Sequence, residues 1–165
     1  GLILVKRKNP RKVVMVDLID TRLRLARELG ADLTFNAKED PRSFIDYQLG
    51  GGSDIVIEAV GIEKTVRQSI QWTARGGKVV IVGLSQQFMS LDMHEIVNKE
   101  VNLEGSFLYD RKEFEEILKE LPSLKPSLHR MISLTAPLSE GVGLFQRLAA
   151  VDDTLLKVIF TDQTS

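Results

Sequence analysis

The feature of this sequence that most restricts its fold is a regular alternation of short β-branched runs with longer helical patterns. Strand-like apolar runs cover residues 13–16, 33–35, 54–58 and 78–82, and segments with helical spacing of apolar residues follow them. Parallel neighbouring strands need a crossover of about a dozen residues or more, which such helices supply. The alternation therefore predicts an α/β fold with a mostly parallel sheet and helices on both of its faces.

Capping residues and glycines mark the predicted helices in the first part of the chain. Asp20 serves as the N-cap of one helix, and Gly30 ends it. Asp40 and Pro41 open the next helix, which the glycines at 50–52 end. The remaining predicted helices of this part cover residues 63–74 and 91–99, and between them Gly76 and Gly77 lead into the strand 78–82, which finishes at Gly83.

The last third of the sequence continues the same pattern with less regular spacing. A strand is predicted over 101–109, from Val101 to Tyr109, with an interruption at Gly105. A helix over 111–121 is expected to stop before Pro122, because proline lacks the N–H that a helix interior requires. The remaining predictions are a loop at 122–126, an extended segment at 129–134, a helix at 139–150 and a strand at 156–161.

The amino-terminal residues 1–5 precede five basic residues between Lys6 and Lys12. If residues 2–7 are the tail of a helix, the sheet lacks its first, central strand. If residues 2–5 are a strand, the short connector to residue 13 forces an antiparallel pair. We favour the helix tail. The basic stretch could contact phosphate, but a solvated helix end is the simpler interpretation.

Composition limits the possible functions further. A chain of 165 residues has room for one compact domain, and a net charge of −1 gives no general attraction to nucleic acid. No apolar run approaches the roughly 18 residues of a membrane span and nothing resembles a signal peptide, so we expect a cytoplasmic protein. Without cysteine, and with only His94 and His129 as imidazoles, a zinc centre built from this chain alone is not expected. Surface or structural roles are expected for both histidines.

Asp17 is the most informative single residue, since it follows a predicted strand directly. An acid at that place in a dinucleotide-binding fold accepts hydrogen bonds from the adenosine ribose. Gly1 lies 17 − 1 = 16 residues earlier, where the last glycine of the phosphate-binding turn could fall. A simple turn or cap role for Asp17 is equally compatible with the spacing. Gly61 and Gly83, after two further strands, either approach a ligand or allow tight turns.

Six motifs occur in an order that resembles one enzyme family. They are VVMVD, RLRLARELGAD, DIVIEAVG, GGKVVIVGL, KEVNLEGSF and LLKVIF. The chain resembles the cofactor domain of the zinc-containing medium-chain alcohol and polyol dehydrogenases, which include the sorbitol and butanediol dehydrogenases. The resemblance implies a Rossmann-like doubly wound parallel sheet and NAD as cofactor over residues 1–165.

The same resemblance implies roles for individual residues. Asp17 would hold the adenosine ribose, Arg22 would lie near the adenine, and Gly1 would be what remains of the pyrophosphate loop. Val60 and Gly61 would flank the adenosine half. The remaining implied contacts are Val82, Gly83 and Leu84 at the nicotinamide ribose, and Ser106, Phe107 and Leu108 by the carboxamide. Some polyol dehydrogenases have arginine at the place of Leu108, which leaves that contact in doubt.

The resemblance also implies what is absent from these residues. The zinc ligands, the proton relay and most of the substrate pocket belong to a catalytic domain outside this chain, so we expect the chain alone to bind NAD weakly and to be inactive. The parent enzyme would transfer a hydride between a secondary alcohol or polyol and NAD, with zinc polarising the alcohol oxygen. The strand 101–109 would pair with its copy in a homodimer. The alternatives are a zinc-free quinone or enoyl reductase of the same superfamily and a non-enzymatic module that binds a nucleotide or self-associates.

Overall fold

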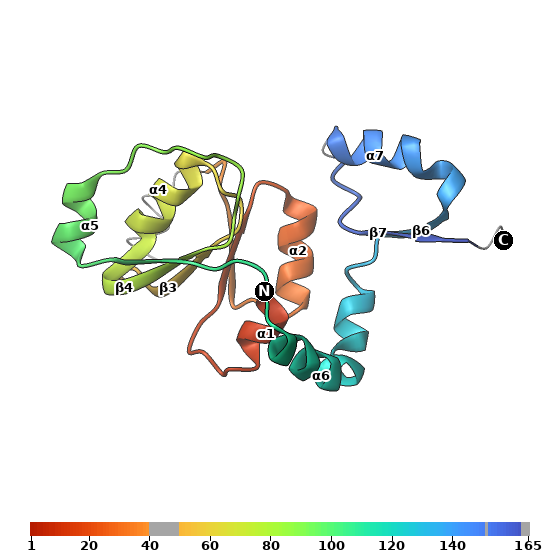
Figure 1. The fold of residues 1–165 in the computed structure, drawn as a ribbon, viewed down its shortest axis with the longest axis horizontal. Helices are drawn as coiled ribbons and strands as arrows, with labels where there is room; N and C mark the ends of the chain where they lie inside the picture. The colour runs from red at the N-terminus through yellow and green to blue at the C-terminus, as the bar shows by residue number, and fades with distance from the viewer. Residues whose placement is uncertain (40–49, 151, 163–165) are drawn as a thin grey trace. The chain divides into compact units, whose positions relative to one another are not determined.

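The computed structural model describes residues 1–39, 50–150 and 152–162 (Figure 1). The helix predicted to open at Asp40 and Pro41 lies outside the described residues. Within the described part, no helix combines the length and apolar character that a bilayer crossing would need.

The strands of the described residues pair into three parallel sheets, of two, three and two strands. Every strand pairing is parallel, which confirms the prediction from the strand and helix alternation. The described strands are not joined into one continuous sheet. Contacts also divide the chain into two compact units, residues 1–39 with 112–165 and residues 40–111, where length alone favoured one. The second unit separates because its three strands pair only with one another.

The first unit begins with a short helix and a two-stranded sheet. The helix α1 buries Leu2 against Val13 and Ala26, which confirms the helical interpretation of the amino-terminal residues. Its end is held by an ion pair between Lys6 and Asp32. The elements are α1 (Leu2–Lys6), β1 (Val14–Asp17), α2 (Asp20–Glu28) and β2 (Leu33–Asn36).

The start of α2 differs from the prediction in one respect. Ile19 is the N-cap, and Asp20 is the first helical residue. The carboxylate that accepts a backbone N–H at this turn belongs to Asp17, whose Oδ1 lies 3.0 Å from the Ile19 nitrogen. Asp20 instead accepts a hydrogen bond from Asn36 at 2.7 Å, which connects the start of α2 to β2. No side chain caps α2 itself, and Asp17 holds the backbone N–H of the residue just before the helix.

The first unit also contains the carboxyl-terminal third of the chain. Ala136, Leu144 and Leu155 form its core, and the helix predicted at 139–150 and the strand at 156–161 are confirmed with small shifts at their ends. The elements are α6 (Arg111–His129), β6 (Leu134–Pro137), the 3₁₀ helix η2 (Leu138–Glu140), α7 (Gly141–Ala149) and β7 (Val158–Thr161).

Two predictions in this part are wrong. The helix α6 does not stop before Pro122 but continues through Pro122 and Pro126 to His129, so the predicted loop is helical. The proline ring suits the helical φ angle, and each proline removes one N–H donor from the helix, which favours bending over termination. The ribbon of α6 changes direction along its length in Figure 1. The strand expected over 129–134 begins only at Leu134, because α6 occupies the chain up to His129.

The described residues of the second unit form a three-stranded sheet in the order β3-β4-β5 together with the helices α4 and α5. Val66 and Ile70 of α4 and Ile96 of α5 pack with Val79 and Val101, so both helices contribute to one core. The elements are β3 (Ser53–Glu58), α4 (Glu63–Trp72), β4 (Thr73–Ile81), α5 (Met93–Lys99) and β5 (Asn102–Gly105).

Two strands of this unit have other limits than predicted. β4 begins at Thr73 and includes Gly76 and Gly77, which were expected to form the preceding turn. A register shift between Ser53 and Ile55 of the neighbouring strand accommodates the extra residues. β5 ends at Gly105 instead of Tyr109, and soon after it Leu108 has a positive φ of 57°, which is incompatible with extended backbone.

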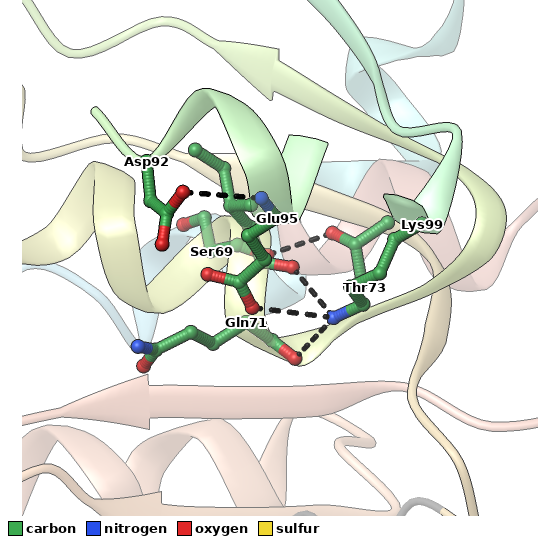
Figure 2. A network of polar contacts seen from close by, with 7 residues as sticks. Ser69, Gln71, Thr73, Asp92, Glu95 and Lys99 are labelled. Atoms are coloured by element: carbon green, nitrogen blue, oxygen red, sulfur yellow. Dashed lines mark hydrogen bonds and ion pairs between the residues drawn. The ribbon is translucent and has the colours of Figure 1, made fainter. Parts of the chain in front are cut away.

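A lysine joins the two helices of the second unit (Figure 2). The last carbonyl groups of a helix have no partner within it. Lys99 of α5 donates to the carbonyl oxygens of Ile70 and Gln71 at 3.0 and 2.8 Å, near the end of α4. Glu95, one turn earlier on α5, lies 3.8 Å from the same amino group. The positive charge is thus placed where the dipole of α4 favours it.

Candidate functional site

The candidate site in the second unit is built around Glu58, the last residue of β3. Only 2% of Glu58 is exposed. Its Oε1 accepts hydrogen bonds from the Val60 N–H at 2.9 Å, the Gly61 N–H at 2.9 Å and the Thr65 hydroxyl at 2.7 Å. The Gly61 N–H also reaches Oε2, at 3.0 Å. A buried carboxylate needs such donors, since an unpaired charge away from water is strongly unfavourable.

The backbone of Glu58 connects the same turn to the end of β4. Its carbonyl oxygen accepts the N–H groups of Val82 at 2.8 Å and Gly83 at 3.1 Å. In return, the Gln86 N–H donates to the Gly61 carbonyl at 2.9 Å, and the Ser85 hydroxyl donates to the Val60 carbonyl at 2.7 Å. The turn after β3 and the turn after β4 are thereby joined into one hydrogen-bonded structure.

Gly61 and Gly83 lie in direct backbone contact inside this structure. A Cβ atom on Gly83 would lie 2.1 Å from the Gly61 nitrogen and 2.7 Å from Oε2 of Glu58. A Cβ atom on Gly61 would lie 2.4 Å from the Gly83 carbonyl carbon, and Gly61 has a φ of 79°, which side chains rarely adopt. Both positions therefore require glycine, because of close approach at both and backbone conformation at Gly61.

The outer side of these turns is apolar and exposed. Val60 and Val82 are exposed, and Leu84 is 82% exposed. Phe107, after the neighbouring strand β5, is 77% exposed. The N–H groups of Val60, Gly61, Val82 and Gly83 are already used inside the molecule, so these turns offer a ligand apolar side chains rather than backbone donors. We call the following residues the loop cluster: Val60, Gly61, Val82, Gly83, Leu84, Ser106, Phe107 and Leu108.

The segment after β5 completes the loop cluster. The Ser106 N–H donates to the Ile81 carbonyl at 2.9 Å, which keeps the segment beside the end of β4. Leu108 is exposed and adopts left-handed backbone, a conformation uncommon for residues other than glycine and often found at functional sites. The carboxyl ends of parallel strands are where ligands of open α/β sheets bind. None of the loop-cluster side chains is a general acid or base, so this arrangement can bind and orient a ligand.

The first unit contributes a separate polar position at the end of β1. The Asp17 side chain is 34% exposed, and its Oδ2 lies 3.8 Å from the Arg22 guanidinium. Since Oδ1 already accepts the Ile19 N–H, Oδ2 has capacity to accept a hydrogen bond from a ligand hydroxyl. The structure therefore brings Asp17 and Arg22 together, as a turn of α2 allows.

The remaining sequence candidates have simpler surroundings. Gly1 is the N-cap of α1, where its carbonyl accepts the Leu4 and Val5 N–H groups at 3.0 and 3.1 Å. His94 and His129 are exposed, as expected for surface residues. Among the described residues, no group of three or more His, Asp or Glu side chains could hold a metal ion.

Glu58 is the residue that the sequence interpretation overlooked. The available indication was an acid at the end of the apolar run DIVIE, directly before the AVG turn. A buried acid at the end of a strand needs donors nearby, and the N–H groups of the following tight turn are close to it. Burial of the side chain could not be deduced without the end of β4, which covers it.

Each unit carries side chains that suit a different part of a dinucleotide. In the first unit, the Asp17 carboxylate can still accept a hydrogen bond, which suits a ribose hydroxyl. In the second unit, the exposed apolar side chains of the loop cluster suit the flat face of a base or nicotinamide ring. Zinc sites of proteins use cysteine, histidine and carboxylate ligands, and the described residues contain no cluster of these. Taken separately, the described residues of each unit suit part of a nucleotide cofactor, and neither set contains a cluster of zinc ligands.

The chain is similar to known dehydrogenases in sequence and in fold. Human sorbitol dehydrogenase is 34% identical over 112 residues, which cover 66% of this chain and 31% of that enzyme. A short chain alcohol dehydrogenase from E. coli CFT073, complexed with NADH, has a TM-score of 0.83 and 22% identity, covering 97% of this chain and 47% of that one. A zinc-binding dehydrogenase structure from Sinorhizobium meliloti 1021, bound to NADP, has a TM-score of 0.73 and 28% identity over 87% of this chain and 43% of that one.

These likenesses confirm the predicted Rossmann-like α/β fold. The chain spans about a third of the length of the sorbitol dehydrogenase that it matches. The sequence model of the zinc-binding dehydrogenases matches residues 2–123, which is most of the chain. The chain therefore belongs to the zinc-binding dehydrogenase family.

Proposed function

We propose that this chain is the cofactor-binding portion of an NAD-dependent, zinc-dependent oxidoreductase that acts on a secondary alcohol or polyol. The observation that carries the proposal is the half-exposed Asp17 carboxylate at the end of β1, in a chain of this family. Its relatives include sorbitol dehydrogenase, a polyol enzyme. The bound dinucleotide would accept or supply the hydride.

Asp17 is proposed to select NAD over NADP. Its Oδ2, which lies 3.8 Å from Arg22, would accept a ribose hydroxyl, whereas a 2′-phosphate would bring like charges together. Arg22 is the nearby cation that could reduce this repulsion, and it lies 3.8 Å from the same oxygen. The NADP-bound structure among the similar proteins makes this preference worth a direct measurement.

The loop cluster is proposed to contact the dinucleotide through apolar surfaces. Val60 and Gly61 would flank the adenosine half, and Val82, Gly83 and Leu84 would line the nicotinamide ribose. The segment from Ser106 to Leu108 would lie by the carboxamide. Support comes from the exposure of these side chains and from the internal use of the adjacent N–H groups. Gly1 is proposed as the last residue of the pyrophosphate turn.

Zinc is proposed to bind elsewhere in the full-length protein. It would polarise the alcohol oxygen and favour loss of the hydroxyl proton before hydride transfer. The residues of this chain would take no part in that step, since the described part has no cluster of metal ligands. Their contribution would be to hold and orient the cofactor.

The strand β5 is proposed as the interface of a homodimer. Among the described strands it pairs with β4 alone, so its other edge offers backbone groups to a further strand, and its residues are exposed. A two-fold copy of the same strand would satisfy these groups. The predicted segment 101–109 is shortened in this proposal to Asn102–Gly105, because the strand ends there.

An assay of the full-length protein tests the proposal. Oxidation of sorbitol and of simple secondary alcohols would be followed with NAD and with NADP, before and after removal of metal by a chelator. We expect activity with NAD that chelation abolishes and added zinc restores. Activity that survives complete metal removal would favour a zinc-free reductase, and a preference for NADP would contradict the role of Asp17.

A further inference from the structure

We propose that Glu58 is a positioning residue of the cofactor site, an inference that rests on the proposed function. Glu58 does not contact the outside of the protein, since it is 2% exposed. It lies instead beneath the two turns that carry Val60, Gly61, Val82 and Gly83. Through these turns it would act on the cofactor without touching it.

Several hydrogen bonds converge on Glu58. Its carboxylate accepts two consecutive backbone N–H groups of the turn after β3, at 2.9 Å each, and the Thr65 hydroxyl of α4. Its own carbonyl accepts two consecutive N–H groups of the turn after β4. One residue therefore sets the position of both turns and ties them to α4.

The Glu58 side chain is a carboxylate, which is a strong hydrogen-bond acceptor. A buried carboxylate forms stronger hydrogen bonds with N–H donors than a neutral acceptor does. Among the described residues, hydrogen bonds from N–H and O–H groups are what hold this carboxylate, and no ion pair reaches it. Both N–H groups donate to this carboxylate, so its loss would leave two backbone donors of the turn without that acceptor and loosen the turn.

The hydrogen bonds to Glu58 also determine which groups of the turns face outward. The N–H groups of Val60 and Gly61 point inward to Glu58, which leaves the Val60 side chain outward and exposed. Gly83 lies so close to Glu58 that a Cβ atom on it would overlap with Oε2 of Glu58. If the Glu58 carboxylate were absent, the turn could present its N–H groups to water, and the apolar surface that would face the cofactor would be lost.

The first experiment uses the 165-residue chain and measures amide hydrogen exchange by NMR. In Glu58→Gln, we expect Val60 and Gly61 to exchange at least about tenfold faster relative to Val79 of the core, because the charged acceptor is lost. The matched control is Thr73→Val, which removes a buried hydroxyl bonded to the Ser69 carbonyl in the same unit. Unchanged relative exchange at Val60 and Gly61 in Glu58→Gln would overturn the proposal.

The second experiment measures kinetics of the full-length protein. Glu58→Gln should raise KM for NAD by about tenfold and leave kcat and KM for the alcohol within about twofold, because a misplaced turn weakens cofactor binding alone. Glu58→Asp keeps the charge but lacks one methylene of reach, so it should also raise KM for NAD. Thr73→Val should lower the melting temperature without changing KM for NAD.

The outcomes separate this inference from the function on which it rests. A wild-type protein that oxidises no alcohol with NAD would overturn the proposed function, whatever the exchange data show. An active wild type whose KM for NAD is unchanged in Glu58→Gln would overturn the role of Glu58 alone. Full rescue of KM by Glu58→Asp would also overturn it, since the charge and not its position would then matter.

Discussion

The two acids that end strands β1 and β3 have opposite surroundings. Asp17 is a third exposed, accepts one backbone N–H and lies 3.8 Å from Arg22. Glu58 is buried and accepts hydrogen bonds from two backbone N–H groups and a hydroxyl. Both are acids at the end of a strand. Asp17 can still accept a hydrogen bond from a ligand, whereas Glu58 accepts hydrogen bonds from the protein itself.

The comparison shows that an acid after a strand is not by itself a sign of ligand binding. Whether such an acid can bind a ligand depends on whether a second backbone segment covers its side chain. The turn after β4 covers Glu58, and Gly83 allows that turn to approach. At Asp17 the side chain remains accessible beside the first turn of α2. Variants that open the covered site or neutralise the accessible one can therefore test the contrast.

The largest effect is expected from a side chain at Gly83. In Gly83→Ala the new Cβ would meet the Gly61 nitrogen at 2.1 Å, so the backbone of both turns must shift. We expect the free energy of unfolding to fall by about 3 kcal/mol. The matched control is Gly105→Ala, where no atom lies within 4 Å and about 0.5 kcal/mol or less is expected. Urea denaturation measures both, and equal losses would show that the turns are not closely packed.

The accessible acid should affect cofactor binding rather than stability. Asp17→Ala in the full-length protein should weaken NAD binding by about 2 kcal/mol, or about 30-fold, through loss of a charged acceptor. NADP binding should fall less or improve. Asp20→Ala is the control, since that exposed acid bonds Asn36 instead. Steady-state kinetics with both nucleotides provide the measurement, and a uniform loss for NAD and NADP would contradict selection by Asp17.

The free edge of β5 should determine association. The Ser106 N–H points to β4, and alternation along a strand then directs the Leu103 N–H to the open edge. Leu103→Pro removes that donor without breaking the pairing to β4, so the dimer should dissociate at least about tenfold more readily. Leu103→Ala retains the donor and should remain dimeric. Light scattering across a concentration series compares them, and a fully dimeric, folded Leu103→Pro would exclude β5 as the interface.

A smaller effect is expected where Lys99 caps α4. Lys99→Met keeps the aliphatic stem but leaves the Ile70 and Gln71 carbonyls without the amino group. The expected loss in the free energy of unfolding is about 1 kcal/mol. Lys64→Met on the exposed side of α4 is the control and should change stability little. Equal free energies of unfolding for the two variants would show that Lys99 does not stabilise the end of α4 measurably.

The smallest effect is a dependence of stability on pH in the first unit. Hydrogen bonds from the Thr154 hydroxyl and N–H, together with Arg147, lower the pKa of Asp152 to about 2. A carboxyl whose pKa is lower in the folded state stabilises the fold above its unfolded pKa of 3.8, and this contribution is lost as pH falls toward about 2. The melting temperature of Asp152→Asn should therefore be below wild type at about pH 5, and the difference should shrink by about pH 2. A constant difference would contradict the assignment.

Much of the architecture was predictable from local patterns. β3, α4 and α5 were located to within two residues because β-branched runs and helical spacing have different periods, whereas β4 begins five residues before its predicted start. The length of α6 was not predicted. Proline was expected to end the helix, but a helix can also bend at a proline and continue, as α6 does through Pro122 and Pro126. The length of β5 was overestimated because its apolar residues continue beyond the point where the backbone turns at Leu108.

The sequence by itself determined the α/β class, the parallel pairing and the acids and glycines at the strand ends, because these depend on the order and spacing of residue types. Only the tertiary structure decided which acid is buried and which is accessible. Burial of Glu58 depends on the contact between Gly61 and Gly83, which lie on different turns. Hydrogen-bond partners of this kind come from segments distant in the chain, so no local pattern can specify them.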